Sequence, residues 1–275
     1  MSMKTIIRKY IVPVVCSAML IVTVSSCSKD KYYKDGGLAN PDFNGTILQY
    51  LQSKPGPFDS LVKVIKIAGM EDVFSKENIT FFAPTDEVIR RTIGQVFTND
   101  PMLNNHPTLN QQLYALHKDT IQKLDDISPA IWKKYLTRYL LKGTYRLKDF
   151  PQLDFSLRPL YPGGYYYGYN GSDLSNIGVV YFTANTVKYS GYRQLCIASI
   201  TDPSNPQNYY YGAAAVASSD IHPTNGIVHS LAVYYPGADS QGSNPNTTGE
   251  LQMSEPMEDL FGMSTDMLQE VILGR

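Results

Sequence analysis

The fold of this chain is decided by a short stretch of sequence, Thr80-Phe81-Phe82-Ala83-Pro84-Thr85-Asp86-Glu87. Its first four residues are a β-prone, mostly apolar run that meets Pro84, which has no N–H to donate to a sheet. Thr85 and the two acids that follow it have the composition of a helix N-terminus. The stretch therefore predicts a strand that ends at Pro84 and a helix that starts directly after it.

A second informative stretch lies far along the chain and reads Asp220-Ile221-His222-Pro223-Thr224-Asn225-Gly226-Ile227-Val228-His229. Asn225 and Gly226 are residue types that adopt positive φ in a tight turn. The apolar run 227–233 then continues as a buried strand. We expect the two stretches to belong to one long-range β framework.

In this order, the two stretches resemble the two signature motifs of the fasciclin (FAS1) domain family, a module of extracellular adhesion and surface proteins. The resemblance covers residues 44–236 and implies an α+β fold, a twisted β-sandwich or wedge with helices packed around one end. It implies structural roles for the matching motif residues, which are Phe82, Pro84, Thr85, Asp86, Asn225, Gly226 and His229. His229 is expected to be a hydrogen-bonded histidine of the framework.

The hydrophobic pattern favours the same fold class. Apolar residues at helical spacing predict helices in the first half of the chain, at 47–51, 58–65, 88–96 and 128–140. Gly69 and Gly143 are expected to end the second and the fourth of these helices. The second half changes to β-type runs, at 179–183, 193–198, 214–217 and 227–233. Helices followed by strands are typical of an α+β domain.

The N-terminus has the pattern of an export signal. Three basic residues precede an apolar stretch at 10–24, which is shorter than the roughly 18 to 20 residues needed to span a bilayer. The end of this stretch, Val24-Ser25-Ser26-Cys27, resembles a bacterial lipobox. We therefore expect residues 1–26 to be a lipoprotein signal peptide and Cys27 to carry acyl groups such as palmitate, with an ordinary secretory peptide as the alternative.

The residues after the signal suggest a location. Ser28 is not acidic, which favours the outer membrane in lipoproteins of this kind, and acyl chains contribute about 0.8 kcal/mol per buried CH₂ to membrane binding. We expect a domain that is anchored in the cell envelope and exposed at the cell surface. A periplasmic orientation stays open.

The rest of the chain divides into four parts. Residues 27–43 are the lipidated cysteine and a polar tether, and residues 44–236 are one FAS1-like domain, since neither motif occurs twice. Inside the domain, 99–126 is polar and rich in Asn and Gln, and 157–176 is rich in Gly and Tyr, so both are interpreted as inserts. Residues 237–249 have the composition of a flexible linker, and residues 250–275 form a C-terminal tail.

The tail contains apolar residues at helical spacing, with Ser264 as the N-cap. These residues are Met263, Met267, Leu268, Val271 and Ile272. The helix can dock on its own domain, or its Met-rich face can bind a partner. Periodicity does not separate the two alternatives.

Charge and residue types argue against several functions. The chain has 24 basic and 25 acidic residues, and without the three bases of the signal it has 21 against 25, with no basic stripe for nucleic acid. Cys196 lies among aliphatic residues, as is typical of a small buried hydrophobe and not of a reactive thiol. The sequence has no His or Cys cluster for a metal and no Gly-x-Ser-x-Gly nucleophile elbow. We expect neither an enzyme nor a cofactor.

Tyrosine is the most suggestive surface feature. Five of the 21 tyrosines fall within 161–169, and three more lie at 209–211. A tyrosine presents a flat apolar face and a hydroxyl group, which suits binding surfaces. The candidate contact residues are Tyr165, Tyr166, Tyr167, Tyr169, Tyr209, Tyr210 and Tyr211. The structural alternative is a Gly-kinked hairpin whose tyrosines pair across its strands.

Together these features predict a non-catalytic surface lipoprotein. Its fasciclin-like domain would serve adhesion or capture a ligand, either a glycan or a surface or matrix protein. The alternative is an accessory subunit of an outer-membrane glycan or nutrient uptake complex. In that case the tyrosines or the C-terminal tail would contact a barrel partner.

Overall fold

The computed structural model describes residues 40–97, 108–200, 202–206, 213–232, 263 and 265–275. Residues 41–275 form one compact unit. Its first residues already pair with the sheet, because the Phe43 N–H donates to the His222 carbonyl and the His222 N–H donates to the Pro41 carbonyl. The folded unit therefore begins slightly before the boundary at residue 44 that the sequence suggests.

Short helices make up most of the first half of the chain. They are α3 (Ile47–Gln52), α4 (Asp59–Ile67), α5 (Glu71–Lys76), α6 (Asp86–Ile93), α7 (Leu109–Ala115) and α8 (Pro129–Leu136), with 3₁₀ turns at η4 (Leu124–Asp126), η5 (Thr137–Tyr139) and η6 (Leu147–Asp149). Local caps explain where several of them start. Thr46 and Thr108 each form a reciprocal capping box with the glutamine three residues later, and Pro129 is the first residue of α8.

The strands form a mixed sheet in the order β2-β1-β7-β6-β5-β4-β3. β1 and β7 are parallel, and the other neighbours are antiparallel. The strands are β1 (Ile79–Ala83), β2 (Leu140–Lys142), β3 (Gly164–Tyr167), β4 (Leu174–Tyr181), β5 (Arg193–Ile200), β6 (Ala213–Ile221) and β7 (Gly226–Leu231). The predicted α+β class is confirmed.

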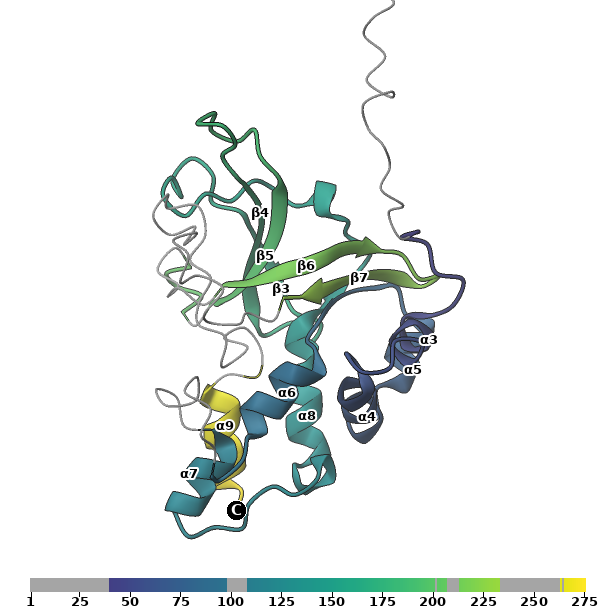
Figure 1. Ribbon diagram of the computed structural model, residues 1–275, viewed down its shortest axis with the longest axis vertical. Coiled ribbons are helices and arrows are strands. Elements are labelled where there is room, and N and C mark those ends of the chain that lie inside the picture. The colour runs from purple at the N-terminus through teal and green to yellow at the C-terminus, as the bar shows by residue number, and fades with distance from the viewer. Residues whose placement is uncertain (1–39, 98–107, 201, 207–212, 233–262, 264) are drawn as a thin grey trace, which may run out of the picture. The chain divides into compact units, whose positions relative to one another are not determined.

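The sheet bends along β6. The first part of β6 pairs with β5, whereas its later part pairs with β7 through two register shifts. Figure 1 shows β4 and β5 running across the direction of β6 and β7, with the helices gathered below the strands in the view. The described strands are thus linked in one bent sheet, and the narrower description as a sandwich or wedge stays a prediction.

The predicted helix over 128–140 is too long at its C-terminal end. The structure ends α8 at Leu136, continues through one 3₁₀ turn, and places Leu140 in strand β2. Apolar spacing could not show this, because Leu136, Tyr139 and Leu140 are all buried whichever element holds them. Gly143, with φ 93°, follows β2 and does not cap the helix, whereas Gly69, with φ 62°, does end α4 as predicted.

Both segments interpreted as inserts contribute to the folded core. The described part of 99–126 contains α7, whose Leu109 and Leu113 are fully buried. The segment 157–176 supplies strand β3 and the start of β4. Composition hid these elements, because their few apolar residues lie among Asn, Gln, Gly and Tyr.

The C-terminal helix α9 (Thr265–Leu273) docks on its own domain, against α7 and α8. Its apolar residues Met267, Leu268 and Val271 are buried in the main core, as is Met263 before it. The Met263 N–H also donates to the buried Tyr139 hydroxyl at 3.1 Å. The structure therefore shows the docked alternative for the tail. The expected N-cap, Ser264, lies outside the described residues.

Ion pairs and hydrogen bonds surround the apolar contact between α9 and the rest of the domain. Arg138 makes a two-pronged contact with Asp266, at 2.6 and 3.2 Å, and its guanidinium carbon lies 4.4 Å from the Tyr135 ring centroid. Glu270 accepts hydrogen bonds from Lys134 and from the Tyr135 hydroxyl, which lower the Glu270 pKa. The Lys134–Glu270 pair is exposed on both sides and contributes little to stability, whereas Arg138 in the other pair is mostly buried.

Candidate functional site

The structure brings the two motif stretches together in adjacent parallel strands. Phe81 lies opposite Val228, and Phe82 lies opposite His229. The Phe82 and His229 rings are 5.1 Å apart between centroids, and both side chains are fully buried. The two stretches therefore form the centre of the framework and do not line an exposed site.

Asn225 joins three elements through its side-chain amide. Its Oδ1 accepts a hydrogen bond from the Ile47 N–H at 2.8 Å, at the start of α3. Its Nδ2 donates to the Phe74 carbonyl at 3.2 Å and to the Glu77 carbonyl at 2.9 Å, at the end of α5. The buried amide thus satisfies backbone groups that the ends of two helices leave without helical partners.

The turn before β7 differs from the sequence prediction. Asn225 does not have positive φ, and the left-handed residue of this region is Asp220, with φ 60°, in the irregular part of β6. Gly226 has φ 154°, and a Cβ built there would lie 1.9 Å from the Ile79 carbonyl oxygen. Gly226 is therefore required by the close approach of β1, and Asn225 by its amide group.

The residues after β1 are structural as well. Asp86 opens α6, and its carboxylate accepts backbone hydrogen bonds from Ser60 at 2.7 Å and from Leu61 at 3.0 Å. It thereby satisfies N–H groups in the first turn of α4. Thr85 is the N-cap of α6, but its hydroxyl makes no cap hydrogen bond. The sequence predicts Asp86 at the start of α6, but it does not predict that the Asp86 carboxylate caps the neighbouring helix α4.

His229 is held in one tautomer by two backbone groups. Its Nδ1 accepts from the Asp220 N–H at 3.3 Å, so its Nε2 is the donor to the Tyr145 carbonyl at 3.0 Å. Burial lowers the pKa of His229, although the hydrogen bond to Tyr145 and the charge of Asp220 act in the opposite direction. The ring is therefore a neutral framework group.

The tyrosines of β3 alternate between solvent and core. Tyr165 and Tyr167 are exposed at 38% and 61%. Tyr166 points inward, where its ring lies 5.4 Å from Phe150 and 5.9 Å from Tyr145, and burial raises its pKa. Two of the three consecutive tyrosines are thus on the outer face, with one spacing residue between them.

The other candidate tyrosines do not extend this face in the described residues. Tyr169 is tied down, because its hydroxyl donates to the Glu77 carboxylate and its N–H donates to the Leu140 carbonyl. Tyr209, Tyr210 and Tyr211 lie outside the described residues. Nor do the β3 tyrosines form aromatic cross-strand pairs. Across from them on β4 lie Asn176, Ser175 and Leu174.

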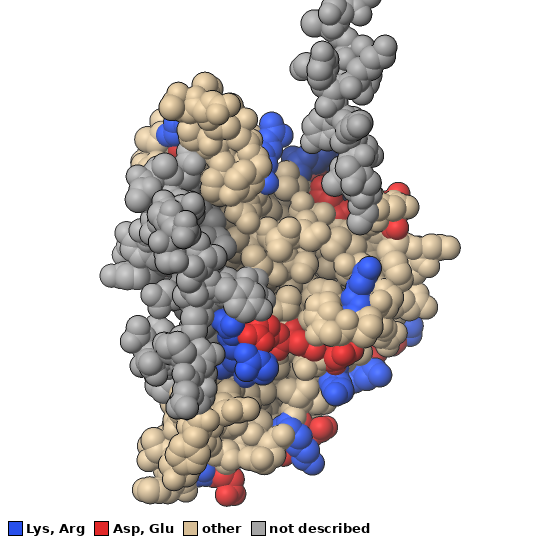
Figure 2. All heavy atoms as spheres, viewed as in Figure 1, with Lys and Arg blue, Asp and Glu red and all other residues tan. Residues whose placement is uncertain are grey.

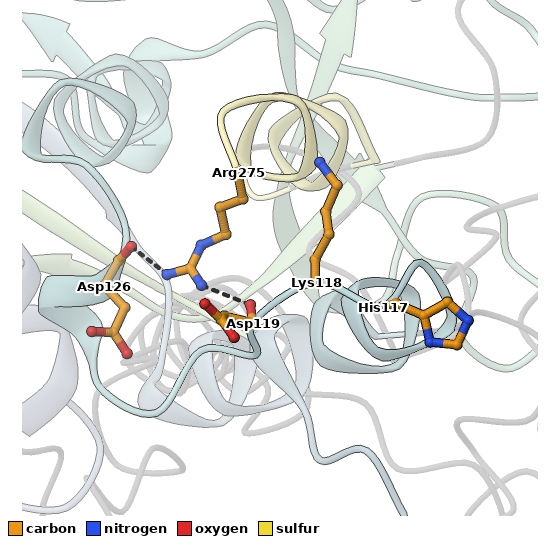
Figure 3. Close-up of a pocket in the computed structure, with 5 residues that line it drawn as sticks. All are labelled: His117, Lys118, Asp119, Asp126 and Arg275. Atoms are coloured by element: carbon orange, nitrogen blue, oxygen red, sulfur yellow. Dashed lines mark hydrogen bonds between the residues drawn. The ribbon is translucent and has the colours of Figure 1, made fainter.

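A polar hollow of about 560 Å³ lies beside the end of α9. It is lined by His117, Lys118, Asp119, Asp126 and Arg275. Figure 3 shows Arg275 reaching to the backbone carbonyls of Asp119 and Asp126, at 2.7 and 2.8 Å, while the His117 ring points away. Lys118 donates to the Ile272 carbonyl at 2.7 Å. The two cations thus attach the C-terminal residues to the domain.

Backbone hydrogen bonds favour the ionised form of Asp126 in this hollow. Asp126 accepts hydrogen bonds from the Gln122 and Lys123 N–H groups, and these lower its pKa. General acid catalysis at neutral pH needs a raised carboxyl pKa. Asp126 is therefore not suited to act as a general acid at neutral pH.

Other groups of the described residues that could bind a metal or react were also located. Among them, no three His, Cys, Asp or Glu side chains are grouped so that they could hold a metal ion. Cys196 is fully buried, and burial raises the pKa of its thiol. Within the same part of the chain, no helix is long and apolar enough to cross a bilayer.

Neither the family models nor the curated proteins give a match to this chain. A solved structure of a FAS1 domain pair from the insect cell adhesion molecule fasciclin I is similar to it, with 19% sequence identity and a TM-score of 0.40. The match covers 68% of this chain and 49% of that structure, so the chain spans about half the length of the solved protein.

Proposed function

We propose that this chain is a lipoprotein of the cell surface whose folded domain is a non-catalytic, fasciclin-like binding module for adhesion or ligand capture. The observation that carries the proposal is the pairing of the two signature-like stretches in adjacent strands of one domain, after a lipobox-like N-terminus. Cys27 would be the lipidated residue and would hold the domain at the outer membrane.

The outer face of β3 is the proposed contact surface. Tyr165 and Tyr167 are exposed on one side of a strand at the end of the sheet order. The inward Tyr166 packs on Phe150 and holds the strand in place. Two tyrosines on a fixed backbone lose little conformational entropy on binding, which suits stacking on a sugar ring or packing on a protein.

Screening the chain from Ser28 onward against glycans and matrix proteins tests this proposal. Tyr165→Ala with Tyr167→Ala should abolish binding of any hit and leave the thermal midpoint within a few degrees, since both side chains are exposed. Tyr166→Ala is the matched control and should lower the midpoint, because it removes a packed ring. Binding that survives loss of both exposed tyrosines would contradict the assigned surface.

The alternative function, a subunit of an uptake complex, has less support from the C-terminal helix. It relied on the Tyr-rich segment or on an exposed C-terminal helix, and the apolar side of α9 is buried on its own domain. Purification in mild detergent separates the two functions. An uptake subunit would co-purify with a barrel protein, whereas the proposed independent module would not.

A further inference from the structure

Two loops at the far end of the β4–β5 hairpin form a distinct surface, here named the hairpin tip, which consists of residues 154–162 and 182–192. Asp154 joins them, because its carboxylate accepts from the Tyr189 hydroxyl at 2.7 Å and lies 3.2 Å from the Lys188 ammonium. The Tyr161 and Tyr189 rings also meet edge to face, with centroids 5.6 Å apart. The two loops are therefore one structural unit.

The hairpin tip exposes large apolar side chains. Leu160 is 70% exposed, Val187 58% and Tyr192 65%, and Leu157 is exposed as well. Single exposed apolar residues are ordinary on protein surfaces, but a group of them on neighbouring loops marks an interaction site.

The exposed side chains are held in place. Ser190 donates from its hydroxyl to the Ala184 and Val187 carbonyls, and the Gly191 N–H donates to the Phe182 carbonyl. Asn185, Thr186 and Tyr189 all have positive φ, which non-glycine residues rarely adopt. Such backbone persists only where the surrounding contacts impose it. The loop is thus built to present Val187.

The charge around these apolar residues is net positive, with Lys188 paired to Asp154. Asp154 is the one acid in the two loops, and it is buried. Burial would raise its pKa, but hydrogen bonds from Ser156, Tyr189 and Lys188 outweigh that effect and lower the pKa to about 2. The cations are Arg158 and Lys188, with Arg193 next to the second loop. Figure 2 shows the upper end of the molecule as mostly uncharged surface, with Lys and Arg side chains and a small acidic patch at its margins.

We propose that the hairpin tip is a membrane-contact site that inserts Leu160 and Val187 into the headgroup boundary of a bilayer containing anionic lipid. Arg158 and Arg193 would lie over the lipid phosphates, since long cationic side chains extend their charge to the interface while their stems stay apolar. Exposed aliphatic groups ringed by cations are what interfacial membrane binding uses. The site deepens the proposed envelope location, because it would fix how the tethered domain lies on the membrane.

An environment-sensitive fluorophore on the tip tests this directly. Val187→Cys in the full, acylated chain can be labelled with nitrobenzoxadiazole, because Cys196 is fully buried and Cys27 is the proposed acylation site. Leu273→Cys is the matched control, since Leu273 is an 84% exposed leucine on α9. In vesicles of phosphatidylcholine and phosphatidylglycerol in equal parts, the label at 187 should brighten several-fold and be quenched by spin-labelled lipid. The label at 273 should not change.

A second variant checks that insertion depends on the apolar side chain. Leu160→Asp should lower the ratio of inserted to free tip roughly tenfold or more, since burial of a leucine side chain is lost. The thermal midpoint should stay unchanged because Leu160 is exposed. High salt, or vesicles of phosphatidylcholine alone, should also reduce the response at 187.

Three outcomes would overturn the proposal. Equal signals from the labels at 187 and 273 would show that the tip stays in water. A response at 187 that needs a second protein and not lipid would make the tip a protein interface, and so would a response without vesicles that grows with protein concentration. Failure of the anchor is a separate result. In that case the chain would not float with neutral vesicles, whereas the tip could still respond to anionic ones.

Discussion

Replacement of Asn225 by alanine should destabilise the domain strongly. The change removes one hydrogen bond to the Ile47 N–H and two to the Phe74 and Glu77 carbonyls. The Ile47 N–H then stays buried without a partner, which costs about 1 to 3 kcal/mol. Loss of the hydrogen bonds to the two carbonyls costs less free energy, because the hydrogen bond to the Glu77 carbonyl is only partly buried. The expected total is about 3 to 5 kcal/mol, or a fall in the thermal midpoint of roughly 10 °C.

The Asn225→Asp substitution separates the contribution of the acceptor Oδ1 from that of the donor Nδ2. The aspartate keeps an acceptor for Ile47 but places a carboxylate oxygen against two carbonyl oxygens. It should therefore destabilise the domain at least as much as Asn225→Ala at neutral pH. Asn170→Ala is the matched control, because Asn170 also accepts two backbone hydrogen bonds, from Ser172 and Asp173, but is exposed. It should cost less than about 1 kcal/mol.

Urea unfolding of the three variants and the parent chain measures these differences. The account expects a lower midpoint for both Asn225 variants with an unchanged m value. If Asn225→Ala and Asn170→Ala lie within about 1 kcal/mol of each other, the assignment of Asn225 as the link between α3, α5 and β7 is wrong.

Three further predictions follow from other residues. The pKa of His229 is lowered from its ordinary 6.5, so below that pH the unfolded chain binds a proton that the folded chain does not. The free energy of unfolding should therefore be retained above about pH 6.5 and fall as the pH drops toward the folded-state pKa of His229. His229→Gln should flatten this part of a pH series of urea midpoints. Gly226→Ala should cost more than about 4 kcal/mol, because its Cβ would meet the Ile79 carbonyl, and soluble yield together with circular dichroism will show whether the fold survives. For α9, Met267→Asp should release the helix to limited proteolysis, since Met267 is buried. Asp266→Asn should cost less than about 1 kcal/mol, since the Asp266 side chain is half exposed and Arg138 keeps its contact with Asp173.

The framework could be predicted from sequence where local chemistry and long-range packing agree. Pro84 ends β1 and Asp86 begins α6, because the missing N–H of proline and the helix dipole act within a few residues. The β-type runs likewise predict strands β5 and β7 and the last part of β4. These are the positions at which the residue itself limits the backbone.

The rest depends on contacts between residues far apart in sequence. Nothing near Asn225 indicates that its amide serves the ends of α3 and α5, so the turn is explained by tertiary hydrogen bonds and not by backbone conformation. Leu140 has the same spacing whether it continues α8 or starts β2, and pairing with Phe81 decides the matter. The hairpin tip could not be predicted, because its two loops meet through tertiary contacts of Asp154 and Tyr161 with Tyr189.

The tyrosine-rich segment shows the same limit for the candidate site. The sequence could nominate Tyr165, Tyr166 and Tyr167 as a group, since three aromatic residues in a row exceed what a strand can bury on one face. Only the register of β3 with β4 separates the outward pair from the inward Tyr166. The binding experiment can therefore use two substitutions and keep the third residue as a control for folding.

The central claim is that two distant stretches of sequence lie side by side as parallel strands in one core. Nuclear Overhauser contacts between selectively labelled rings of Phe82 and His229 test it most directly, because their centroids are 5.1 Å apart. The account predicts strong cross-peaks between these rings, lost only when the domain unfolds. A folded protein that lacks them would contradict the account.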